Sequence, residues 1–248
     1  MQDAYRHCEA LVREADRDRY IASLFAPADR RPHLYALYAF DLELLRIGQV
    51  VHEALAGEMR LQWWRDALAG QVPDQVAAHP VARAIIDTIA QCALPAGPID
   101  RLIDARAHDL YDDPFATRDE LEEYARETAS ASFALAARIL DRDGNVAQVA
   151  DSAGIAAILI ATLQGPLRCK APSIARTDIV ARARAALEQA RRNWSAVAQA
   201  ARPAFLSLAV TSALLQRAER DPDRLHPKGL APWRRQWLIW RAARRGIF

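Results

Sequence analysis

Thirteen prolines divide this sequence of 248 residues into segments that are rich in alanine. Within the segments, apolar residues recur at spacings of three and four, which is the period of an amphipathic helix. Because proline interrupts a helix everywhere except in its first turn, the prolines mark helix boundaries. The nine glycines are too few for the many tight turns of an all-β fold. We therefore predict an all-α protein, with helices near residues 3–16, 32–51, 54–69, 80–92, 98–111, 118–140, 145–164, 176–200, 202–219 and 232–245.

The predicted helices follow one another without a linker-like change in composition and without an internal repeat. The longest gap between them, at about residues 166–177, is too short to separate two domains. Hydrophobic residues make up 52% of the chain, which is enough to bury a sizeable core. We therefore expect residues 1–248 to form a single helical domain.

Several classes of function lack the residues that they need. A formal net charge of +2 excludes a nucleic-acid partner that is bound through overall charge. The glycine-rich motifs of dinucleotide-binding and P-loop proteins are absent from the sequence. The six histidines and three cysteines are scattered without the spacing of a zinc site. We therefore expect no zinc site and no nucleic-acid partner.

The sequence also indicates a cellular compartment. Residues 1–20 mix acidic and basic residues and lack the apolar core of a secretory signal. No uncharged apolar stretch reaches the roughly 18 residues of a membrane-spanning helix. Cys8, Cys92 and Cys169 are odd in number and far apart, as in proteins whose thiols stay reduced. These features predict a cytoplasmic protein.

The first candidate for chemistry is Asp41, in the segment HLYALYAFDLELL. It lies three residues after Tyr38, on the face where the apolar residues of this predicted helix gather. A carboxylate that points into a helical bundle needs a partner, which can be an arginine, a tyrosine, a water molecule or a metal ion. Two interpretations stay open, a buried ion pair with one of the many arginines and a contact with a ligand or metal.

The second candidate is the acidic segment IDRLIDARAHDLYDDPF. Carboxylates four residues apart on a helix can together hold Mg²⁺, which prefers oxygen ligands. The arginines between them and the proline that follows favour another interpretation, a solvent-exposed helix face that ends in an ordinary turn. The acidic residues of this segment are Asp100, Asp104, Asp109, Asp112 and Asp113.

The third candidate is the predicted helix of residues 232–245, in a segment that carries no acidic residue after residue 224. Three tryptophans follow a helical spacing along it, with arginines beside them. A basic helix with an aromatic stripe can lie on an anionic membrane surface. It can equally dock on the bundle while its arginines extend into solvent. The residues of this membrane or partner surface are Trp233, Arg234, Trp237, Trp240 and Arg241.

Four blocks of the sequence, in chain order, are RYIASLFAPADRRPHLYALYAF, GEMRLQWWRDAL, AHDLYDDPFATRDELEEYARETASAS and AGIAAILIATL. They resemble the squalene/phytoene synthase family, and the resemblance extends over about residues 15–245. It implies an all-α isoprenoid-synthase fold around a central cavity. The enzymes of this family join two prenyl diphosphates head to head. Two aspartate-rich motifs on their facing helices hold the Mg²⁺ that neutralises the leaving diphosphate.

This sequence departs from the family at both metal motifs. The first motif should follow the run Tyr38-Ala39-Phe40, and the second should lie on the helix that matches Gly154. Leucine and alanine cannot ligate Mg²⁺, and an arginine repels it. Where the family's enzymes have the acids and the asparagine of the two motifs, this sequence has Leu45, Arg46, Gln49, Ala161 and Gly165.

The resemblance leaves two acids near the site, Asp41 and Asp109, which are the candidate catalytic residues. It also implies a ligand-binding role for both of them and for Tyr38 and Tyr124. We expect no cofactor and no bound metal. Mg²⁺ is expected only if a metal site has been rebuilt from Asp41, Asp109, Asp112 or Asp113.

One branch of the family carries the signature GE-hydrophobic-RLQWWRDA and has lost acids in the same places; it includes a mitochondrial complex I assembly factor. Similarity to this branch implies a non-catalytic protein that binds a lipid or isoprenoid in its cavity, or a partner, at an anionic membrane surface. The partner would be a membrane protein or a respiratory-complex subunit, reached from the inner face of the cell membrane. Two alternatives stay open. One is a Mg²⁺-dependent prenyltransferase that condenses two prenyl diphosphates in isoprenoid biosynthesis, and the other is a helical adaptor whose cavity is filled by side chains.

Overall fold

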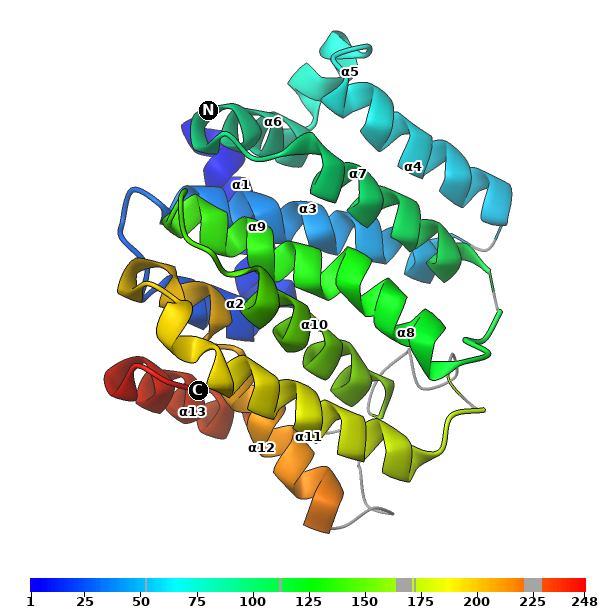
Figure 1. The fold of residues 1–248 in the computed structure, drawn as a ribbon. Helices are drawn as coiled ribbons and strands as arrows, with labels where there is room; N and C mark the ends of the chain where they lie inside the picture. Colours follow the sequence, from blue (N-terminus) through cyan, green and yellow to red (C-terminus); the bar gives the residue numbers. More distant parts are fainter. Residues whose placement is uncertain (52, 112, 164–170, 172, 221–228) are drawn as a thin grey trace.

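The computed structural model describes residues 1–51, 53–111, 113–163, 171, 173–220 and 229–248. These residues form helices and helical turns but no β-strand, so the predicted all-α class is confirmed. The helices pack side by side, with α4 and α5 at one end of the bundle and α12 and α13 at the other (Figure 1). The α-helices of the described residues are α1 (Gln2–Ala15), α2 (Arg17–Ser23), α3 (Arg31–Val50), α4 (Ala54–Leu68), α5 (Pro73–Ala78), α6 (Pro80–Cys92), α7 (Ala96–Ala105), α8 (Arg118–Ala125), α9 (Ala131–Leu140), α10 (Ala147–Thr162), α11 (Arg176–Arg192), α12 (Leu208–Arg220) and α13 (Pro232–Arg245).

Proline places the start of several helices where the sequence predicts it. α6 and α13 begin at Pro80 and Pro232, and Pro32 is the second residue of α3. The first turn of a helix has no intrahelical partner for its N–H groups, so the missing N–H of proline costs nothing there. The predicted bounds of these three helices therefore agree with the structure to within one residue.

The long helix predicted for residues 176–200 is shorter in the structure. α11 ends at Arg192, and two 3-10 turns follow, at Trp194–Ala196 and Gln199–Phe205. Pro203 lies inside the second turn; it lacks an N–H and disfavours the α conformation at the residue before it. α12 begins at Leu208, six residues after the predicted start.

Two short helices, α2 and α5, lie where the sequence analysis predicts none. α2 follows α1 directly after Asp16, whose side chain accepts a hydrogen bond from the backbone N–H of Arg19 at 3.0 Å. This cap stops α1 and starts a helix in a new direction. Helices of seven and six residues contain too few apolar positions for a period to be recognised.

The predicted helix of residues 118–140 is interrupted by a π-helical turn. Thr117 caps its start by accepting a hydrogen bond from the backbone N–H of Glu120 at 3.2 Å, as the motif TRDEL predicts. The π turn, Arg126–Ser130, separates α8 from α9 and widens the helix by one residue. It places Ala129 in the wall of a cavity at the centre of the bundle.

α10 approaches this π turn so closely that only glycine fits at residue 154. A Cβ atom added there would lie 2.2 Å from the backbone nitrogen of Ser130 and 2.1 Å from its Oγ. The Ser130 hydroxyl donates to the carbonyl of Asp151 at 3.0 Å and so ties the two elements together. Both α10 and the π turn contribute to the cavity wall, so this contact sets the width of the cavity.

α3 is the central helix of the bundle, and it packs against α1, α6, α9 and the 3-10 turn Arg106–Leu110. Leu34, Leu37 and Phe40 are fully buried along it. Asp41 follows them in the middle of the helix and is only 6% exposed. A carboxylate at this depth is stable only with charged or hydrogen-bonding partners.

No helix in the described part of the chain is both long enough and apolar enough to cross a lipid bilayer. Cys8 and Cys92 are buried free thiols. Cys169 lies outside the described residues.

Candidate functional site

A cavity of about 500 Å³ lies beside α3, between α9, α10 and α12. Its presence excludes the alternative in which side chains fill the interior of the bundle. One part of the wall is apolar and is formed by Leu45, Phe133, Ala157, Ile158, Ala161, Val210 and Leu214. The other part is charged and is formed by Asp16, Asp18, Arg19, Asp41, Arg106, Asp109 and Arg235.

Asp41 lies in the charged part of the wall, where two arginines hold it. Arg19 on α2 donates from Nη1 to Oδ2 of Asp41 at 2.6 Å. Arg106, in the 3-10 turn after α7, donates from Nη2 to Oδ1 at 2.8 Å. Of the partners that the sequence leaves open for Asp41, the structure contains arginines, one for each carboxylate oxygen.

Asp109 shares Arg106 with Asp41. The Nη1 of Arg106 donates to Asp109 Oδ2 at 3.2 Å and to the Tyr124 hydroxyl at 2.7 Å. The Tyr124 hydroxyl in turn donates to Asp109 Oδ1 at 2.9 Å. The side chain of Asp109 is only 10% exposed, so it is not part of a solvent-exposed face. Arg106 thus brings together Asp41, Asp109 and Tyr124.

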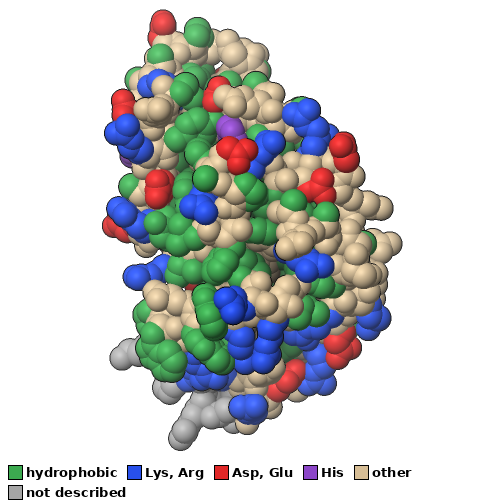
Figure 2. Space-filling view, turned by 90° about the vertical axis from the view of Figure 1, so that its left-hand side faces the viewer, with side chains coloured by type: hydrophobic (Ala, Val, Ile, Leu, Met, Phe, Trp, Pro, Cys, Tyr) green, Lys and Arg blue, Asp and Glu red, His purple; other side chains and the backbone are tan. Residues whose placement is uncertain are grey.

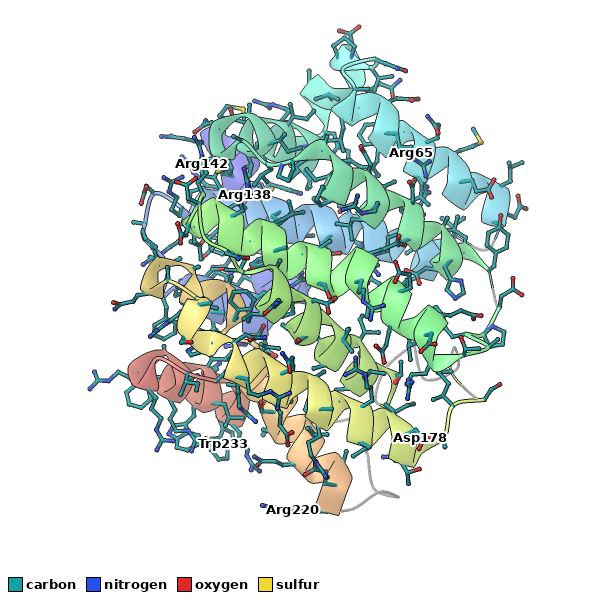
Figure 3. The ribbon with its side chains drawn as sticks, viewed as in Figure 1. Arg65, Arg138, Arg142, Asp178, Arg220 and Trp233 are labelled. Carbon is teal, nitrogen blue, oxygen red and sulfur yellow. The ribbon has the colours of Figure 1, made fainter. Side chains whose placement is uncertain are left out.

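The other acids of the same segment lie elsewhere. Asp104 is exposed and forms an ion pair at 2.6 Å with Arg65 of α4, which Figure 3 labels; neither residue lines the cavity. Asp100 and Asp113 are exposed as well. Asp112 lies outside the described residues. The solvent-exposed interpretation therefore describes Asp100, Asp104 and Asp113, whereas it is wrong for Asp109.

Tyr38 lies one turn before Asp41 on α3 and also lines the cavity. The guanidinium of Arg19 lies over its ring, 4.8 Å from the centroid. Its side chain is buried. Burial raises the pKa of Tyr38, so the hydroxyl remains protonated and can donate a hydrogen bond.

Of the residues that the resemblance matches to the family's metal motifs, those that the structure describes lie at or near the cavity. Leu45, Gln49 and Ala161 line the cavity. Arg46 lies 3.7 Å from Glu43 in an ion pair on the same helix. Gly165 lies outside the described residues.

The carboxylates of the site form a chain of alternating charges, in the order Asp16, Arg19, Asp41, Arg106 and Asp109. Mg²⁺ would need the carboxylate oxygens that the two guanidinium groups already bind. Within the described residues, no group of three or more His, Cys, Asp or Glu side chains is arranged to hold a metal ion. The residues present therefore do not fit a bound Mg²⁺.

The two arginines also determine the ionisation of Asp41. Burial raises the pKa of its carboxyl, but Arg19 and Arg106 lower the pKa by more, to below the ordinary value of 3.8. The unfolded chain therefore takes up a proton at Asp41 before the folded chain does. The stabilisation that the ionised Asp41 gives the fold is complete above the ordinary pKa of its carboxyl. It is lost as the pH falls through the lower pKa that this carboxyl has in the folded protein.

We accordingly expect the free energy of unfolding to decrease as the pH drops below about 4. Urea denaturation at a series of pH values measures this slope. In Asp41→Asn the side chain keeps its shape but no longer titrates, so the slope below about pH 4 should be smaller than in the wild type. Equal slopes in the two proteins would contradict the role given to Asp41.

A further ion pair in the cavity wall joins α2 to α13. Arg235 donates from Nε to Asp18 Oδ1 at 2.9 Å. Neither Asp18 nor Arg235 is among the site residues predicted from the sequence. Arg235 precedes the buried Leu238 and Ile239 by three and four positions, and this spacing is the signal that places it on the inner face of α13. Arg19 is the first residue of the first block that resembles the family, and no other feature of the sequence indicates that it is a site residue.

α13 docks on the bundle through a narrow buried stripe of Leu238, Ile239 and Ala242. Its tryptophans face outward, and Trp233 is 70% exposed and extends away from the bundle (Figure 3). Basic and hydrophobic side chains gather in the lower half of the face shown in Figure 2. The aromatic-basic face of α13 consists of Trp233, Arg234, Trp237, Trp240 and Arg241. The helix therefore both docks on the bundle and presents this face to its surroundings.

Comparisons with known proteins agree with the fold and the sequence blocks. The family model of squalene/phytoene synthase matches residues 12–165. Complex I assembly factor 6 of NADH dehydrogenase (ubiquinone) from Rattus norvegicus is 28% identical, over 91% of this chain and 77% of that protein. The protein of the same name from Homo sapiens is 27% identical, over 89% and 76% of the two chains.

Two solved structures are similar over most of their length. A dehydrosqualene synthase has a TM-score of 0.73 at 16% identity, with 98% of this chain and 96% of that chain covered. Squalene synthase HpnC from Alicyclobacillus acidocaldarius has a TM-score of 0.69 at 26% identity, with 88% and 94% covered. The matched residues, the all-α fold and the central cavity lead to one conclusion: the chain belongs to the squalene/phytoene synthase family.

Proposed function

We propose that this chain is a non-catalytic member of its family that serves as an assembly factor, binding a lipid or a partner protein at a membrane surface. The observation that carries the proposal is the occupation of Asp41 and Asp109 by Arg19 and Arg106. A prenyl synthase needs carboxylates that are free to hold Mg²⁺ against a diphosphate. Here the two acids left near the site, Asp41 and Asp109, are neutralised by guanidinium groups instead.

The names of the relatives support a role in assembly. The relatives from Rattus norvegicus and Homo sapiens are named as assembly factors of complex I. By this likeness, the partner would be a respiratory-complex subunit or another membrane protein. The proposed location is the cytoplasmic side of the cell membrane, where the aromatic-basic face of α13 would meet anionic lipid.

The first test is the turnover of prenyl diphosphates by the purified, folded protein. Farnesyl or geranylgeranyl diphosphate is supplied with Mg²⁺ and NADPH, and the release of pyrophosphate is measured. We expect no release above the control without protein, because the described residues include no free carboxylate cluster that could draw Mg²⁺ onto the leaving group. Release that depends on Mg²⁺ and disappears in Asp41→Asn would establish the prenyltransferase instead and overturn the proposal.

The aromatic-basic face should bind anionic membranes. We expect the double variant Trp237→Ala with Arg241→Ala to bind vesicles containing phosphatidylglycerol about tenfold more weakly than the wild type. Each basic residue at such a surface contributes about 1 kcal/mol, and an exposed tryptophan adds apolar contact with the interface. Binding should also weaken as salt is added, because the attraction is screened. Vesicle co-sedimentation measures both effects.

A matched control lies at the other end of the bundle, on α4 (Figure 1). Leu55 is 69% exposed there, and Arg60 is an exposed arginine on the same helix. The double variant Leu55→Ala with Arg60→Ala removes one apolar and one basic side chain, yet it should leave vesicle binding unchanged. Equal loss in the two double variants would show that the binding is non-specific and would refute the role of α13.

A further inference from the structure

The charged part of the cavity wall is unsuited to an anionic ligand. Among the described residues, three arginines and four aspartates line the cavity, which gives this part of its wall a net charge of −1. Each of these arginines is bound to at least one of the aspartates. A diphosphate would therefore meet no unpaired cation in the described wall, and the surplus carboxylate would repel it.

The wall does offer polar groups that carry no charge. The side chain of Tyr38 is mostly buried and lines the cavity, so its hydroxyl is one such group. Ser207 and Thr211 contribute hydroxyl groups to the same wall from the start of α12. A hydroxyl in a cavity wall can donate a hydrogen bond to a ligand oxygen that enters the cavity.

The rest of the wall is apolar and comes from four helices. Phe133 on α9, Ile158 on α10 and Leu214 on α12 are its larger side chains. A volume of about 500 Å³ is within the range of small-molecule sites and far above the gaps left in a close-packed core. An apolar space of this size favours a hydrocarbon chain over water.

We propose that this cavity binds an uncharged, chain-like amphiphile such as a prenyl alcohol. Its oxygen accepts a hydrogen bond from Tyr38, and its hydrocarbon chain lies against Phe133, Ile158 and Leu214. The inference rests on the proposed function, because a site that ionises diphosphates needs carboxylates that are free to bind Mg²⁺. It goes further by naming the class of ligand. The ion pairs that occupy Asp41 and Asp109 leave no cation for a diphosphate in the described wall, so the cavity favours the alcohol over the diphosphate.

The test is a calorimetric titration of the full chain with two probes, farnesol below its solubility limit and farnesyl diphosphate with and without Mg²⁺. We expect farnesol to bind at one site per chain, at least about tenfold more tightly than the diphosphate. Tighter binding of the diphosphate, or no saturable binding of farnesol, would overturn the inference. Pyrophosphate is measured in the same samples: its release would refute the proposed function, whereas absence of both binding and release would refute only the ligand.

Two variants, together with one control variant, locate the bound farnesol. Ala161→Trp places an indole in the cavity and should weaken farnesol binding at least tenfold, while Ala147→Trp, at the exposed start of α10, should not. Tyr38→Phe should weaken farnesol binding about three- to tenfold, the usual effect of one hydrogen bond, yet leave the binding of the hydrocarbon farnesene unchanged. A Tyr38→Phe variant that binds both probes as the wild type does would contradict the role of the hydroxyl.

Discussion

Arg106→Leu is expected to lower the free energy of unfolding by about 3–5 kcal/mol, the usual loss when one partner of a buried ion pair is removed. Arg106 is 6% exposed and neutralises two carboxylates at once. Without it, Asp109 loses its cation, Asp41 keeps only Arg19, and the Tyr124 hydroxyl loses its donor. Urea denaturation followed by circular dichroism at neutral pH measures the loss.

An exposed ion pair in the same protein provides the control. Arg65 binds Asp104 at 2.6 Å, but both side chains are more than a third exposed. Solvent screens such a pair, so Arg65→Leu should cost less than about 1 kcal/mol. Adding Asp41→Leu to Arg106→Leu should recover part of the loss, because it removes a carboxylate that has lost one of its two cations. Similar losses in Arg106→Leu and Arg65→Leu would contradict the importance of the buried network.

Gly154→Ala should destabilise the fold by about 2 kcal/mol, although alanine is the better helix former. In an open helix the change gains up to about 1 kcal/mol of helix propensity. Here the new methyl group would overlap the backbone of Ser130, which cannot rotate away as a side chain could. Overpacking of this kind costs about 1–3 kcal/mol or more, so the clash outweighs the gain. Thermal and urea unfolding of the variant and the wild type measure this change in the free energy of unfolding.

Gly97 is the matched glycine for this comparison, since it also lies within a helix, near the start of α7. The nearest atom to a Cβ there is the terminal nitrogen of Arg101, at 3.5 Å, which is ordinary contact. Gly97→Ala should therefore leave the stability unchanged or raise it slightly. If Gly154→Ala were as harmless as Gly97→Ala, the close packing of α10 on the π turn would be refuted.

The helices were predictable because their signals are local. Proline positions and the apolar period lie within one segment, and they set the bounds of α3, α6 and α13. The π turn was not predictable, because it differs from an α turn by a single residue of register. That difference is settled by how closely α10 approaches Ser130, a contact between segments far apart in the sequence.

In the candidate site, too, the local features were predictable from the sequence and the contacts between distant segments were not. The helical period places Asp41 on an inward face, and burial then requires a partner. The period does not say which helix lies opposite, so the choice of Arg19 and Arg106 over the other arginines came only with the packing of α2 and of the turn after α7 against α3. The spacing of the acids also could not show which residues of the acidic segment face the cavity and which face solvent. Asp104 and Asp109 lie five residues apart, yet one faces solvent and the other the cavity.

The ion pair between Asp18 and Arg235 bears on how the protein is made, because 217 residues separate its two partners. At a translation rate of about 5–20 residues per second, roughly 10–40 s pass between the synthesis of the one and of the other. Leu208, the first residue of α12, follows Ile158 by 50 residues. At the same rate, the cavity wall around Phe133 and Ile158 therefore faces water for roughly 2.5–10 s before α12 is made. The nascent chain therefore presents on the ribosome the kind of apolar surface that chaperones bind. Its yield in the cell should depend on chaperone supply more than the stability of the finished bundle suggests.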